Sequence, residues 1–138
     1  VTQNAALWKF EGTAYSVSTT NLNSSGVVDM SLTPLRRYFN PTTLSHFWTA
    51  FPAMENLSGL VSEGNSGWVF TSQQPGTVPV YRFYNPLTGV HFWSQFFESG
   101  LAPSFISEGV AFFAFPGQSD PRAIAMRRYK CVGCDLSF

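Results

Sequence analysis

The sequence contains little charge. Only 12% of its 138 residues are Asp, Glu, Lys or Arg, and the eight basic and eight acidic residues cancel. A soluble domain usually has about 25% charged residues. Without a net positive field the chain has no general means of attracting a polyanion, so we expect no nucleic-acid partner. The lack of any apolar run of about 18 residues argues equally against membrane insertion.

The sequence also lacks a charged N-terminal segment that leads into a hydrophobic one, the pattern of a secretion signal. It begins at Val1 rather than Met. We therefore expect a processed or excised chain whose targeting segment, if there is one, lies upstream.

Cysteine is scarce, with Cys131 and Cys134 in a Cys-Val-Gly-Cys turn. Four interpretations remain open: a local disulfide, two free thiols, half of a zinc site and a redox motif. Zinc needs about four ligands, and only His46 and His91 are good further candidates. A redox pair belongs at a helix N-terminus after a strand, and no such context is visible. We favour a structural turn or disulfide, and expect no metal and no cofactor.

Aromatic residues are plentiful, at 17% of the chain, and they follow an internal repeat. Residues 34–48 and 79–93 each contain an arginine, an Asn-Pro turn and the tripeptide His-Phe-Trp, and residues 127–138 form an eroded third copy. The repeat length is about 45 residues. In this alignment Arg37, Arg82 and Arg127 are equivalent.

A second marker, a Glu-Gly pair, precedes an apolar run in each copy, at Glu11, Glu63 and Glu108. Recurring Arg and Glu in a chain so short of charge predict three equivalent ion pairs between the copies. The alternative is that the arginines Arg37 and Arg82 bind carboxylated sugars. We favour the ion pairs.

Short apolar runs bounded by Gly, Pro, Asn and Ser predict strands joined by turns. We expect strands to end at Asn40 and Asn85 and to resume at the His-Phe-Trp tripeptides, with Gly89 free to adopt a positive φ. Residues 21–26, an insertion in the first copy, predict a lengthened hairpin loop. Residues 49–57 and 94–101 each have room for one helical turn.

The predicted fold class is all-β: a single β-trefoil domain over residues 1–138, with short helical turns. Its three pseudo-symmetric units are approximately 8–57, 58–101 and 102–138, the last closed by residues 1–7. Ring closure removes exposed sheet edges, which a domain so weakly charged would otherwise have to protect. A different closed β fold with pseudo-threefold symmetry is the second possibility.

Residues 80–93, followed by residues 106–113, resemble a repeat of uncharacterised function found in secreted bacterial and fungal proteins. Those repeats read approximately V-Y-R-F-Y-N-x-x-T-G-x-H-F-Y-T and then E-G-V-A-F-Y, and the similarity covers essentially the whole chain. The resemblance implies a secreted or cell-surface protein, often joined to other domains of a larger parent protein. Analogy with trefoil lectins implies glycan binding. It supplies no catalytic residues.

The candidate ligand-binding residues lie in the two well-preserved copies: Asn40, His46, Trp48 and Arg37 in the first, Asn85, His91, Trp93 and Arg82 in the second. Tryptophan faces stack on sugar rings, while the polar side chains pair with hydroxyls. The competing interpretation is that the aromatics fill the core. Because side chains alternate along a strand, His and Trp should share one face, Phe the other, and one face should be less buried.

Catalysis is not expected, because the histidines belong to repeated units and no carboxylate pair stands out. Two hypotheses remain. The first is a non-catalytic, lectin-like module that binds a cell-surface glycan or a polysaccharide. The second is a protein–protein interaction or adhesin-tip module that binds no glycan.

Overall fold

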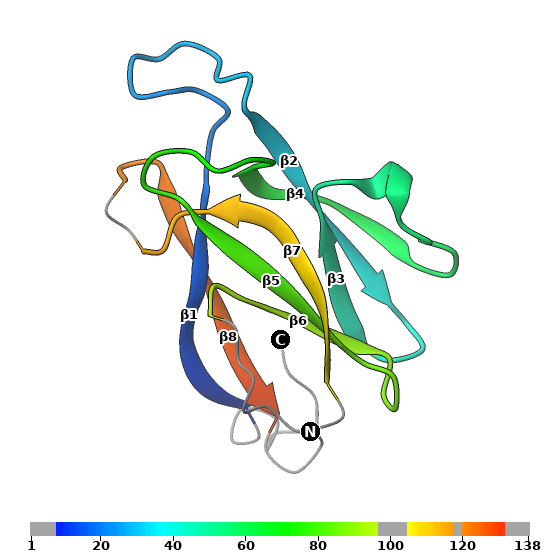
Figure 1. The fold of residues 1–138 in the computed structure, drawn as a ribbon. Coiled ribbons are helices and arrows are strands. Elements are labelled where there is room, and N and C mark those ends of the chain that lie inside the picture. The colour runs from blue at the N-terminus through cyan, green and yellow to red at the C-terminus, as the bar shows by residue number, and fades with distance from the viewer. Residues whose placement is uncertain (1–7, 97–104, 118–119, 132–138) are drawn as a thin grey trace.

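The computed structural model describes residues 8–96, 105–117 and 120–131, with side chains from residue 14 to residue 127 within these ranges. These residues form eight strands and one 3₁₀ turn (Figure 1). The strands are β1 (Trp8–Ser18), β2 (Leu32–Asn40), β3 (Ser45–Thr49), β4 (Val61–Phe70), β5 (Val78–Asn85), β6 (Val90–Ser94), β7 (Ile106–Ala114) and β8 (Ala123–Cys131), and the turn is η1 (Pro52–Met54). The predicted all-β class is confirmed.

Two asparagines close the hairpins β2–β3 and β5–β6, as predicted. The Asn40 side-chain oxygen accepts hydrogen bonds from the backbone N–H groups of Thr42 and Thr43 at 2.9 and 3.3 Å. The equivalent oxygen of Asn85 accepts one from the N–H of Leu87 at 3.0 Å. Gly89 has φ +76°, which a residue without Cβ adopts at little cost.

The other predicted turns are also confirmed where the structure describes them. The insertion at residues 21–26 forms a small hairpin loop, with a bridge between Leu22 and Val28. η1 supplies the single helical turn expected within residues 49–57. The second turn, expected within residues 94–101, and the Cys131–Cys134 turn extend outside the described residues.

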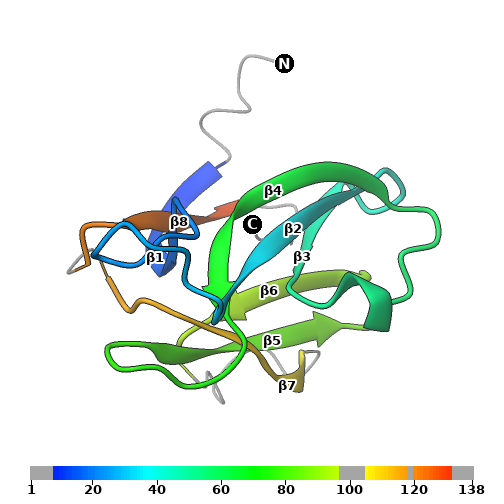
Figure 2. The same cartoon turned by 90° about the horizontal axis from the view of Figure 1, so that it is seen from above.

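All strand pairings are antiparallel, and they join the eight strands into one sheet. The order is β3-β2-β4-β7-β5-β6, with β1 pairing with β4 and β8. Seen from above in Figure 2, three groups surround a common centre: β2, β3 and β4; β5, β6 and β7; and β1 with β8. The pairing of the first strand with the last brings the two ends of the described chain together.

The register corrects one alignment made from the sequence. Arg36 lies opposite Asn65 and Tyr81 lies opposite Val110, in each case two residues after the repeated glutamate. The matching pair in the third group is Arg127 with Thr13. Arg127 is therefore equivalent to Arg36, and the next residue, Arg128, is equivalent to Arg37 and Arg82.

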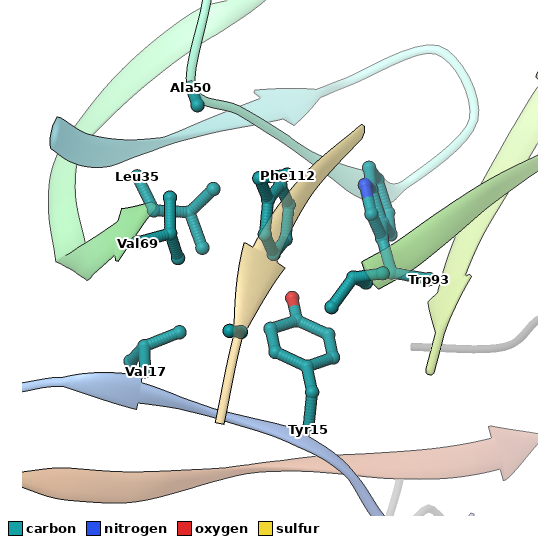
Figure 3. Packing of buried hydrophobic residues seen from close by; sticks show 9 residues of the cluster. Tyr15, Val17, Leu35, Ala50, Val69, Trp93 and Phe112 are labelled. Atoms are coloured by element: carbon teal, nitrogen blue, oxygen red, sulfur yellow. The ribbon is translucent and has the colours of Figure 1, made fainter. Parts of the chain in front are cut away.

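The core lies where the three groups meet, and Figure 3 shows it from close by. Phe112 is 1% exposed and meets the ring of Tyr15 edge to face, with centroids 5.4 Å apart. Val17, Val69 and Ala114 surround them and belong to the three long strands β1, β4 and β7. Burial raises the pKa of the Tyr15 hydroxyl well above its ordinary value.

The structure thus shows an all-β domain built on one eight-stranded antiparallel sheet. It does not by itself show a β-trefoil, which stays a prediction. Among the described residues, no helix is long and apolar enough to span a membrane.

Candidate functional site

A pocket of about 380 Å³ opens between the hairpins β2–β3 and β5–β6 and the segment that contains η1. Most of its lining is polar. It comprises Asn40, Thr43, Ser45, His46, Phe47, Glu55, Asn56, Ser58, Leu60, Arg82, Tyr84, Gly89, His91 and Glu108.

Aromatic contacts hold the two hairpins against each other beneath the pocket. The ring of Phe47 on β3 meets His91 on β6 edge to face, with centroids 4.9 Å apart, and Trp93 at 5.8 Å. The guanidinium carbon of Arg82 lies 5.0 Å from the centre of the same Phe47 ring. At the tips the hairpins are so close that a Cβ on Gly89 would lie 3.2 Å from a Thr43 methyl.

Arg82 is the central charged residue of the pocket. Its Nη1 donates to Glu55 Oε2 at 2.7 Å, and its Nε donates to Glu108 Oε1 at 2.7 Å. Burial alone would raise the pKa of Glu55, but hydrogen bonds from Arg82 and Thr49, with the Arg82 charge, outweigh it and lower this pKa. Burial alone would also lower the pKa of Arg82, whereas the two carboxylates raise it overall. Arg82 therefore stays charged and is committed to two partners.

His91 adds an imidazole to the same cluster. Its Nε2 lies 3.2 Å from Glu108 Oε1, the oxygen that also accepts from Arg82. The pKa of His91 is lowered, chiefly by burial and also by the Arg82 charge, although Glu108 and Glu55 oppose the change. His91 is therefore mainly uncharged at neutral pH.

An equivalent cluster occupies the first copy. Arg37 Nε lies 3.0 Å from Glu63 Oε1, and His46 Nε2 lies 3.1 Å from the same oxygen. The predicted Arg–Glu pairs between copies are thus confirmed for Arg37 with Glu63 and for Arg82 with Glu108. The third pair involves side chains outside the described ones. Arg37 is 43% exposed at its side chain and Arg82 18%, so the two clusters differ in burial.

The tryptophans do not line this pocket. Trp93 is 5% exposed and belongs to the core, and within the described residues its indole N–H has no hydrogen-bond partner. Trp48 is partly buried, and its N–H lies 3.2 Å from the Ser66 hydroxyl.

In the second copy, the expected difference in burial between the Phe and His/Trp faces is seen at His91, whose side chain is 19% exposed, but not at Trp93. Phe92 is 4% exposed and Trp93 5%. The reason is that β6 is covered on both faces. Phe92 stacks on Phe83 on one side, while Trp93 meets Trp48 on the other.

Four of the eight candidate residues come together in the pocket: Asn40, His46, Arg82 and His91. Arg37, Trp48, Asn85 and Trp93 do not line it, and Asn85 is 8% exposed at its turn. The candidate list omitted Glu55, Asn56, Tyr84 and Glu108. Of these, only Glu108 had a sequence signal, because it recurs with the Glu-Gly marker.

The chemistry available in the pocket is hydrogen bonding by carboxylates, amides and imidazoles beside an aromatic ring. Among the described residues, no group of three or more His, Cys, Asp or Glu side chains could hold a metal ion. The prediction that the protein is not an enzyme stays a prediction.

These features define an all-β domain with a polar pocket between two packed hairpins. The chain belongs to the family described as a domain of unknown function, DUF5648, whose model matches residues 1–115. No curated protein and no solved structure matches the chain. The family description names no activity.

Proposed function

We propose that this domain is a non-catalytic carbohydrate-binding module whose ligand occupies the pocket between the hairpins. The observation that carries the proposal is the lining itself. Amide, imidazole and carboxylate groups converge there beside Tyr84 in a hollow of about 380 Å³. Small-molecule sites usually measure about 300–1,000 Å³, and this pocket, at the lower end, matches one or two sugar rings.

Sugar hydroxyls both donate and accept, and the pocket offers both functions. Glu55 and Glu108 accept, Asn56 does both, and the imidazole of an uncharged histidine has one donor and one acceptor nitrogen. The ring of Tyr84 lies 4.6 Å from that of His91, which makes a partly exposed aromatic wall for the apolar face of a sugar.

The proposal includes a setting. By the resemblance of its repeats, the protein is secreted or exposed at a cell surface and binds a surface glycan or a polysaccharide, alone or beside other domains of a larger protein. Three equivalent strand pairings, β1 with β8, β2 with β4 and β5 with β7, support the finer proposal of a β-trefoil with pseudo-threefold units. In such a fold each unit can carry a binding site.

The test is a glycan array with the wild-type domain, followed by titration of each hit against variants. Asn56→Ala removes an exposed amide from the pocket rim and should weaken binding without changing the melting temperature, because among the described residues Asn56 makes a local turn contact only. Met30→Ala, at an 89% exposed residue of the connection between β1 and β2, is the matched control and should bind as the wild type does. Absence of any glycan hit, or equal affinity for both variants, would refute a glycan site in this pocket.

A second candidate function is protein binding. It is favoured by a hollow of about 220 Å³ whose lining includes Phe51, Met54 and Val110, which are 40%, 83% and 48% exposed. Exposed apolar clusters often mark interaction surfaces. Met54→Asp would then abolish capture of a protein partner and leave glycan binding unchanged.

A further inference from the structure

We propose that the pocket selects sugars that carry a free amino group over sugars that carry a carboxylate. This inference rests on the proposed glycan-binding function and names the class of ligand. It argues against the alternative that the sequence left open, in which Arg82 binds carboxylated sugars.

The charge of the lining favours a cationic ligand. Leaving the imidazoles aside, the charged side chains of the pocket are the carboxylates of Glu55 and Glu108 and the guanidinium of Arg82. The lining therefore has more negative than positive charge. An acidic sugar would bring a third carboxylate into a partly buried space, where like charges repel more strongly than in water.

Arg82 is already paired with two carboxylates. Its Nη1 and Nε each donate to a carboxylate at 2.7 Å, and its side chain is 18% exposed. Because Glu108 and Glu55 already occupy Nε and Nη1, a carboxylated ligand could form a bidentate pair with the guanidinium only by displacing one of them. The displaced carboxylate would then remain in the pocket without a partner, which is costly.

Glu108 offers an acceptor that a ligand can reach. Glu108 uses Oε1 for both Arg82 and His91, and its side chain is 32% exposed. Its Oε2 has no hydrogen bond from the described residues. An ammonium group on a sugar ring supplies up to three donors and a positive charge, which suits this oxygen.

Glu63 provides a matched comparison within the same chain. It makes the equivalent contacts to Arg37 and His46 but does not line the pocket. Changing Glu63 therefore removes the same kind of ion pair without changing the charge of the lining.

The experiment begins with the sugar configurations that bind, for example the gluco or the galacto series. For each of them, calorimetry measures the dissociation constants of the hexose, the N-acetylhexosamine, the hexosamine and the hexuronic acid. At about pH 7, where the amino group of a hexosamine is mostly protonated and His91 is mainly uncharged, the hexosamine should bind on the order of fivefold more tightly than the hexose, and the acid more weakly than both. Raising the ionic strength from about 0.05 to 0.5 M should reduce the advantage of the amine.

Glu108→Gln should remove the preference for the amine, whereas Glu63→Gln should keep it. If near-UV circular dichroism shows that Glu108→Gln does not fold, Glu55→Gln tests the other carboxylate of the lining. The comparison of ligands on the wild-type domain tests the inference without any variant. If the hexuronic acid binds as tightly as the hexosamine or more tightly, this inference is overturned and the proposed function stays intact. Failure of every sugar to bind would overturn both.

Discussion

Arg82 and Arg37 occupy equivalent positions but differ in burial, and this predicts unequal effects of the same substitution. Methionine keeps most of the apolar stem of arginine and removes the charge. Arg82→Met would remove two hydrogen bonds of 2.7 Å and leave Glu55, 18% exposed, beside an apolar side chain. Arg37→Met would remove one contact of 3.0 Å from a guanidinium that is 43% exposed.

The magnitudes follow from that difference. Removing one partner of a fully buried ion pair costs about 3–5 kcal/mol. Because the partners of Arg82 are partly exposed, we reduce this to about 2–3 kcal/mol and add about 0.5–1 kcal/mol for the contact with Phe47. Exposed pairs contribute about 0–1 kcal/mol, so Arg37→Met should cost no more than that.

Urea unfolding followed by tryptophan fluorescence is a suitable assay, since the slope for small proteins is about 1–3 kcal/mol per M. Arg82→Met should lower the midpoint by about 1–2 M and Arg37→Met by less than about 0.5 M. If the cost arises from an unpaired carboxylate, the double variant Arg82→Met, Glu55→Gln should recover about half of the loss. Equal midpoints for the two single variants would refute the assignment of Arg82 as the buried tie between the hairpins.

Three further predictions concern stability. The pKa of His91 is lowered in the folded state, chiefly by burial, so the unfolded chain binds the proton more tightly. Stability should therefore fall as the pH drops through about 6.5. The difference between the urea midpoints at about pH 7.5 and 5.5 should be smaller in His91→Gln than in the wild type. Gly67→Ala should lower the melting temperature much more than Gly76→Ala, because its Cβ would lie 2.5 Å from a valine methyl on β1, whereas that of Gly76 would meet nothing within 4 Å; similar melting temperatures would contradict the packing. Trp93→Ala should cost about 3–5 kcal/mol in denaturant unfolding, while Leu87→Ala, at an 83% exposed residue, should stay within about 0.5 kcal/mol.

The hairpins and the ion pairs between copies were predictable because their causes are local or recurrent. Asn40 and Asn85 end strands because their side chains accept hydrogen bonds from backbone N–H groups two or three positions further along the chain. Such a turn is visible in a short stretch of sequence. Arg37 with Glu63 and Arg82 with Glu108 recur with the repeat. Recurrence marks residues that join one copy to the next.

Glu55 was not predictable, because it lies in a stretch that the repeat does not mark and meets Arg82 only after the hairpins pack. The burial of Trp93 was left open for a related reason. Alternation along a strand tells which side chains share a face, but not that a neighbouring hairpin covers the second face. Arg127 was misaligned by one position because the alignment used the number of residues between copies. The pairing of β8 with β1, which sets the true register, is not visible in the sequence.

The pairing of β1 with β8 has a consequence for how the chain folds. Trp8 pairs with Cys131, so the first strand of the described chain finds its main partner only after nearly all of that chain has been synthesised. Until then β1 presents an unpaired edge, which is the kind of surface that promotes aggregation. Contacts this distant in sequence also slow folding. We therefore expect the last step of folding to be the docking of β8, and a chain truncated before Ala123 to be the species most prone to aggregate during synthesis.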